Sequence, residues 1–134
     1  MFLLDTNILS EMVRKRPNGR VRQKLIQCPV EDCYSSVICR YELRYGAFLR
    51  DDGPTFWMRL QGEILSLPTW LPVSVPVADA AATLAAELER KGQTLDTHDC
   101  LIAATALVHG LILVSRNTRH FHRIHGLRVE NWFG

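Results

Sequence analysis

The sequence predicts an α/β fold, a three-layer sandwich whose central parallel sheet has about five strands. Short apolar runs recur along the chain, and the clearest of them, Leu111–Val114, is followed at once by polar residues. Runs of this length are typical of buried strands. Amphipathic segments with helical periodicity separate them. Strands that alternate with helical crossovers form parallel sheets covered by helices on both faces.

The first apolar run, Phe2–Leu4, leads directly into Asp5 and an amphipathic segment. We expect a strand buried on both faces, followed by a helix from about Asn7 to Arg14. Asp5 would then lie at the carboxyl end of a parallel strand, where open α/β sheets bind their ligands. The competing interpretation is that Asp5 only caps the helix, because aspartate is a preferred N-cap residue.

The remaining elements follow from the same periodicities, with proline and glycine marking their ends. Further helices are expected over about Arg20–Gln27, Val37–Asp51, Thr55–Leu67 and Val77–Lys91, and the segment Thr94–Asp99 opens another that runs to about His109. Further strands are expected over Asp32–Ser36, Leu71–Val75, Leu111–Val114 and, at the sheet edge, Leu127–Glu130.

Composition limits the class of protein. The 134 residues are expected to form one domain, residues 1–134, with a substantial core. A formal net charge of +2 means that nucleic-acid binding would depend on local basic patches. No apolar run is long enough to span a membrane, and the first one lacks the basic start of a signal peptide, so a cytoplasmic protein is expected. Its four cysteines are then expected to be reduced structural thiols.

Glu42 interrupts an apolar stripe. It shares a helix face with Ile38, Tyr45 and Leu49, and this stripe is expected to point inward. Burying an unpaired carboxylate is costly, so Glu42 must meet a cation or line a cleft. The arginines of the same segment could form a surface ion pair with it, but they lie off the stripe.

Asp99 is a second acid on an apolar face, which it shares with Ile102, Ala103 and Ala106. It falls in the first turn of its helix, and Asp96 is better placed to be the N-cap. If Asp5, Glu42 and Asp99 cluster, their charges repel and require a hard cation. Carboxylate ligands suit Mg²⁺ or Mn²⁺, and phosphoryl transfer through metal-activated water is the chemistry most natural to such a site.

The residues around these acids resemble a known family. Three segments are similar to the acidic motifs of PIN-domain nucleases: Leu3–Asn7, Ser35–Gly46 and Asp99–Ala106. Two more are similar to the C-terminal motifs of VapC toxins, including the FitB-like branch: Leu111–Phe121 and Leu127–Trp132. Each motif is weak alone, but together they cover essentially the whole chain in the expected order.

The resemblance implies a PIN-like fold and a Mg²⁺-dependent endoribonuclease, with Mn²⁺ as the alternative ion. It also implies the toxin half of a toxin–antitoxin pair: a homodimer that forms a hetero-oligomer with a small antitoxin, whose C-terminal peptide occupies the active-site groove. DNA would be contacted only through the antitoxin, and no membrane is involved. The RNA target is not identified by the sequence.

Carried over by motif, Asp5, Glu42 and Asp99 would be the catalytic acids. Asp5 and Asp99 are the best metal ligands, and Glu42 would complete the site directly or through water. Thr6 and Ser36 would be supporting polar groups. Asn117 stands where many members have a fourth acid, so one or two metals remain possible; Asp96 could compensate, although capping is its simpler role.

The acid-free stretch from Arg116 to Arg128 is expected to form a cationic rim that contacts phosphate. A zinc site built from its histidines lacks a matching ligand set. These histidines, whose role stays open, are His120, His122 and His125.

Two other functions are consistent with parts of the sequence. A haloacid-dehalogenase-type phosphatase also begins with a strand and an aspartate, but it needs a second aspartate where this chain has Asn7. A catalytically weak module that binds RNA or a partner is favoured by Asn117 and by His120, which replaces an acid often found there. The intact trio of acids argues against this module.

Overall fold

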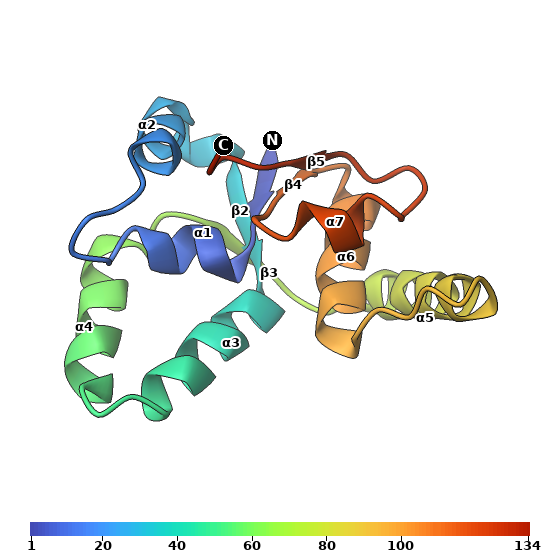
Figure 1. Cartoon of the computed structure of the whole chain (residues 1–134), viewed down its shortest axis with the longest axis horizontal. Coiled ribbons are helices and arrows are strands. Elements are labelled where there is room, and N and C mark those ends of the chain that lie inside the picture. Colours follow the sequence, from blue (N-terminus) through green and yellow to red (C-terminus); the bar gives the residue numbers. More distant parts are fainter.

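One parallel sheet of five strands organises the computed structural model, which describes residues 1–134. The strand order is β3-β2-β1-β4-β5, so the first strand lies at the centre (Figure 1). This confirms the predicted three-layer α/β sandwich. The strands are β1 Phe2–Leu4, β2 Cys33–Ser36, β3 Thr69–Leu71, β4 Ile112–Val114 and β5 Val129–Glu130.

Helices cover both faces of this sheet, and Figure 1 shows α4 and α5 on opposite sides of it. The first four are α1 Thr6–Glu11, α2 Gly19–Gln27, α3 Val37–Phe48 and α4 Gly53–Glu63. They are followed by α5 Val75–Arg90, α6 Thr97–His109 and the short α7 Thr118–Phe121. A single 3-10 turn, Val30–Asp32, precedes β2.

Alternation along β1 divides the core in two. Leu3 packs with residues of α5 and α6, whereas Leu4 packs with residues of α1, α2 and α4 on the opposite face. Both side chains are fully buried. Helix α3 contributes to both clusters, with Cys39 in the first and Leu43 in the second. It therefore lies at the carboxyl ends of the strands, between the two helical layers.

Several boundaries differ from the sequence prediction. The third strand was expected at Leu71–Val75 but ends at Leu71, because Pro72 follows and has no N–H to donate to the sheet. Ser74 instead caps α5, accepting a hydrogen bond from the Val77 amide. The expected helix to Asp51 ends at Phe48, and the short α7 was not predicted.

The expected inward stripe on α3 was wrong. The buried side chains of this helix are Cys39, Leu43 and Ala47. Of the predicted stripe only Ile38 packs against a core, and Tyr45 and Leu49 are 55% and 70% exposed, so the face leaves the core at Glu42. Glu42 therefore lies at an opening of the molecule and not inside an apolar layer.

All four cysteines are free thiols. The Sγ atoms of Cys28 and Cys33 lie 3.0 Å apart, joining the end of α2 to the start of β2. No helix of the chain has both the length and the apolarity that crossing a membrane would require.

The position of β4 inside the sheet, between β1 and β5, predicts that Leu113→Ala causes a large loss of stability. Leu113 is fully buried between the sheet and the α5–α6 layer, so truncation leaves a cavity that costs about 2–5 kcal/mol. The control Val108→Ala removes an exposed side chain of α6 and should change the free energy of unfolding by less than about 0.5 kcal/mol. Urea denaturation measures both, and equal losses would contradict the packing described.

Candidate active site

Asp5 lies at the carboxyl end of β1 and is 6% exposed. Its Oδ1 atom accepts a hydrogen bond of 2.7 Å from the Thr6 amide, which makes it the N-cap of α1. Its Oδ2 atom accepts a second bond of 2.7 Å from the Ser115 hydroxyl. The capping interpretation of Asp5 is therefore confirmed. The same residue also presents a carboxylate at the carboxyl end of the central strand, so its predicted role as a ligand stays a prediction.

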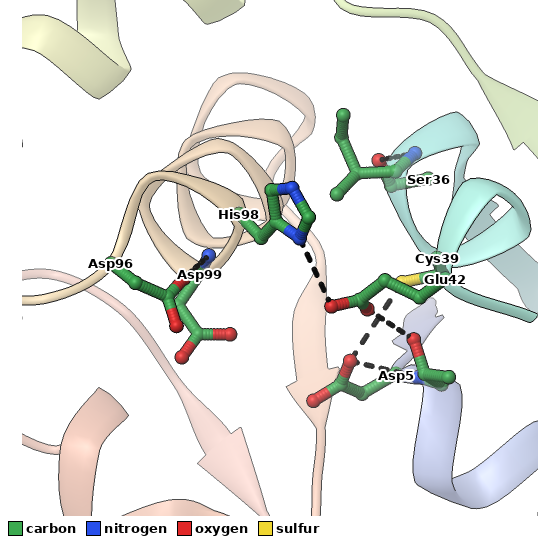
Figure 2. A network of polar contacts seen from close by, with 9 residues as sticks. Asp5, Ser36, Cys39, Glu42, Asp96, His98 and Asp99 are labelled. Atoms are coloured by element: carbon green, nitrogen blue, oxygen red, sulfur yellow. Dashed lines mark hydrogen bonds and ion pairs between the residues drawn. The ribbon is translucent and has the colours of Figure 1, made fainter. Parts of the chain in front are cut away.

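Glu42 reaches the same place from α3 (Figure 2). The Thr6 hydroxyl donates a hydrogen bond of 2.6 Å to Glu42 Oε1. On the other side, His98 Nδ1 lies 3.4 Å from Glu42 Oε2. Thr6 thus contributes its amide to Asp5 and its hydroxyl to Glu42, and holds the two carboxylates next to each other.

Cys39 completes the group of possible ligand atoms. One ligand atom each from Asp5, Cys39 and Glu42 lies within 4.8 Å of the others. The Cys39 thiol is 3.7 Å from Asp5 Oδ1, and burial together with the charge of Asp5 raises its pKa. The sulfur therefore stays protonated at neutral pH and acts as a donor to Asp5, which leaves the carboxylates as the ligands for a hard divalent cation.

Asp99 approaches from the first turn of α6, on the side of that helix near Asp5 and Glu42 (Figure 2). Its backbone amide donates a 2.9 Å hydrogen bond to Asp96, which confirms Asp96 as the N-cap. Burial, and after it the charges of Asp96, Asp5 and Glu42, raise the pKa of Asp99 to about 6.

Burial also raises the pKa of Asp5, against the hydrogen bonds from Ser115 and Thr6, and the charge of Glu42 adds to the shift. Two acids with raised pKa values beside a third carboxylate form an electrostatically frustrated group. A divalent cation would relieve this repulsion, so the donor set fits such an ion.

The other residues predicted from sequence lie around this centre. Ser36 caps α3, accepting a 3.0 Å hydrogen bond from the Ile38 amide, and so supports Glu42 through the helix. The guanidinium of Arg116 lies 4.6 Å from the ring centre of Phe133. The exposed side chain of Asn117 pairs with His120 Nδ1 at 2.9 Å, and contacts neither Asp5 nor Glu42 by a hydrogen bond.

Sequence reasoning missed three contributors: Cys39, His98 and Ser115. The parallel register pairs Leu4 with Val114, which places Ser115 beside Asp5. That register is visible only in the folded sheet. Cys39 lies one helical turn before Glu42, and His98 directly precedes Asp99. The sequence therefore shows that both residues are near the acids along the chain, but it does not show that their side chains point toward them.

Comparison with known proteins places this geometry in a family. The family model described as PIN domain matches residues 2–127. The chain belongs to the PIN-domain family. Toxin FitB of Neisseria gonorrhoeae is 38% identical over 126 residues, which cover 90% of this chain and 91% of FitB.

A second relative is the tRNA(fMet)-specific endonuclease VapC of Shigella flexneri, 34% identical over 131 residues, with 98% of this chain and 97% of that protein covered. Among solved structures, VapBC2 from Rickettsia felis, bound to a DNA fragment from its promoter, superposes with a TM-score of 0.88 at 28% identity and covers 98% of both chains. This PIN domain therefore belongs with the VapC and FitB toxins.

The burial of Asp99 and the charges beside it predict a pH-dependent stability in metal-free protein. The pKa of Asp99 is about 6 in the folded chain and 3.8 ordinarily, so the folded state binds the proton more tightly. The free energy of unfolding therefore falls as pH rises through this window. Asp99→Asn should reduce that fall and raise the melting temperature at pH 7 in chelator.

Asp79→Asn, which neutralises an exposed aspartate of α5, serves as the matched control and should leave the pH profile unchanged. Thermal denaturation across pH 4–7 measures both variants. A metal-free wild type that gains stability between pH 4 and pH 6 relative to Asp99→Asn would contradict the electrostatic description.

Proposed function

We propose that this PIN domain is the toxin of a toxin–antitoxin pair and acts as an endoribonuclease that hydrolyses RNA phosphodiester bonds. The observation that carries the proposal is the close approach of Asp5 and Glu42 at the carboxyl end of β1, within 4.8 Å of each other. Asp99 faces them from the first turn of α6, and their charges contribute to its raised pKa. The names of the VapC and FitB relatives support the same activity.

In this proposal Asp5 and Asp99 are the direct ligands of Mg²⁺, or of Mn²⁺, and Glu42 completes the site directly or through water. A bound divalent ion would lower the pKa of a water molecule and stabilise the leaving oxygen. The chain supplies three carboxylates, because Asn117 carries no charge and its side chain pairs with His120. We therefore propose one tightly held ion.

The surrounding residues fix the ligands. The Thr6 amide and the Ser115 hydroxyl each donate a hydrogen bond to one oxygen of Asp5 and so fix the orientation of its carboxylate. The Thr6 hydroxyl donates to Glu42 and fixes that carboxylate in the same way. Asp96 and Ser36 act one step further out by capping the helices that carry Asp99 and Glu42. Arg116, exposed and stacked on Phe133, is placed to contact an RNA phosphate.

The partners proposed are RNA, a cognate antitoxin and a second copy of the chain. An open cavity of about 310 Å³ between α3 and α4 supports the proposal that an antitoxin binds. It is lined by apolar and cationic side chains, which suit a peptide. Among these, Phe48 and Met58 are 70% and 72% exposed. The homodimer, and contact with DNA through the antitoxin alone, rest on the family.

The proposal predicts that Asp5→Asn abolishes RNA cleavage. Removing a charged ligand forfeits several kcal/mol of transition-state stabilisation, so the rate should fall by roughly 100-fold or more. Purified, antitoxin-free protein is incubated with RNA and Mg²⁺ or Mn²⁺, and the ends are mapped; 5′-phosphate and 3′-hydroxyl products are expected. Asp79→Asn, far from the acids in sequence and exposed on α5, should cleave like the wild type.

Cleavage that persists at full rate in Asp5→Asn or in chelator would contradict the mechanism. The pairing of Asn117 with His120 keeps a second candidate function in view, a PIN-fold module that binds RNA or a partner without cutting. Wild-type protein that binds RNA but has no measurable affinity for Mg²⁺ or Mn²⁺ and cleaves nothing would establish that module instead.

A further inference from the structure

An aromatic hollow adjoins the acids. Its lining residues are Tyr41, Glu42, Tyr45 and His98, and its volume is about 440 Å³. The rings of Tyr41 and Tyr45 are stacked, with centroids 6.0 Å apart and planes inclined by 14°. His98 meets Tyr41 edge-on, at 5.5 Å and 84°.

These rings are not part of either core. Tyr41 and Tyr45 are 54% and 55% exposed, while the buried side chains of α3 lie on another face of the helix. The two rings are aligned, open to solvent and surrounded by polar groups. An exposed apolar surface of this kind indicates a binding site for a ligand or a partner.

The hollow and the acids share Glu42 as a common wall. Tyr41 directly precedes Glu42 in the chain, and His98 Nδ1 lies 3.4 Å from Glu42 Oε2 (Figure 2). A group seated on the tyrosines would therefore lie directly beside the acids, with Glu42 between them.

The charge of the lining narrows the chemistry of the occupant. The hollow contains no lysine or arginine and includes one carboxylate, so a phosphate would be disfavoured there. A flat, uncharged ring with hydrogen-bond donors suits it, because tyrosines offer stacking faces and Glu42 and His98 offer polar edges. Unpaired nucleobases have this chemistry, and aromatic side chains are their usual platform.

We propose that Tyr41 and Tyr45 form a stacking subsite for an unpaired base of the RNA, next to the nucleotide whose phosphodiester is cleaved. This inference rests on the proposed function and adds a substrate requirement to it. A base inside a duplex is already stacked on its neighbours and cannot reach the rings, so the subsite selects single-stranded loops or ends.

Binding tests this separately from cleavage. Short single-stranded RNA carrying 2-aminopurine is titrated against Asp5→Asn protein in Mg²⁺, and both anisotropy and stacking quench are recorded. Adding Tyr41→Ala or Tyr45→Ala should weaken binding roughly 5- to 100-fold and relieve the quench. Tyr41→Phe and Tyr45→Phe keep the rings and should bind normally. Leu49→Ala, which removes an exposed apolar side chain at the end of the same helix, is the matched control.

A double-mutant cycle also needs a change in the RNA, and an abasic nucleotide at the quenched position removes the base from that side of the contact. If the base sits on the rings, the abasic RNA should bind both the parent protein and Tyr41→Ala with the same reduced affinity, since the two changes remove one contact. Additive losses would overturn the subsite. So would unchanged RNA binding by both alanine variants, or an absence of RNA binding altogether.

Two further outcomes would assign the hollow to another occupant and overturn the inference. In the first, the alanine variants alter the oligomeric state in sedimentation while RNA affinity stays unchanged, which makes the hollow an interface between copies. In the second, only antitoxin affinity changes. If wild-type protein cleaves no RNA but shows the tyrosine-dependent quench, the proposed nuclease fails and the base-binding subsite stands.

Discussion

The burial of neighbouring carboxylates at the carboxyl end of β1 is the constraint on which the rest of this structure depends, and their mutual repulsion adds to its cost. Asp5 is 6% exposed, yet Glu42 comes close enough that both accept hydrogen bonds from Thr6. Such a group survives folding only if other parts of the chain hold it together. The Ser115 hydroxyl and the Thr6 amide stabilise the ionised form of Asp5, and the central place of β1 in the sheet makes the arrangement rigid.

The local structure and the site are built by the same residues. Asp5, Ser36 and Asp96 are the N-caps of α1, α3 and α6. Asp5 is itself one of the three acids, and α3 and α6 carry the other two, Glu42 and Asp99. Each cap fixes the first turn of its helix, and thereby the direction in which the acid leaves the backbone. A loss of one cap would therefore weaken the helix and displace a ligand at the same time.

Sequence patterns were sufficient for the layers, and they predicted the position of two of the acids at the ends of their elements. Asp5 follows an apolar run, and Asp99 shares a face with Ile102 and Ala103, both of which are fully buried. Glu42 does lie beside Asp5, but the argument that led to it was wrong, since Tyr45 and Leu49 of its stripe are exposed. The sequence places Ser115 directly after its strand, at the position equivalent to Asp5. The contact between the two residues could not be predicted, because it depends on the register between β1 and β4, and nonlocal pairing leaves no periodic signal.

Helix α3 shows why exposure, more than periodicity, separates function from packing here. Cys39, Leu43 and Ala47 face the cores, whereas Glu42 and the pair Tyr41 and Tyr45 face outward beside α6. Both stripes have helical spacing, and periodicity alone cannot say which one is buried. The packing of α3 between the two helical layers decides it. That packing leaves a carboxylate and two aromatic rings on one open face, so that the proposed acid chemistry and the proposed base recognition would act on the same strand of RNA.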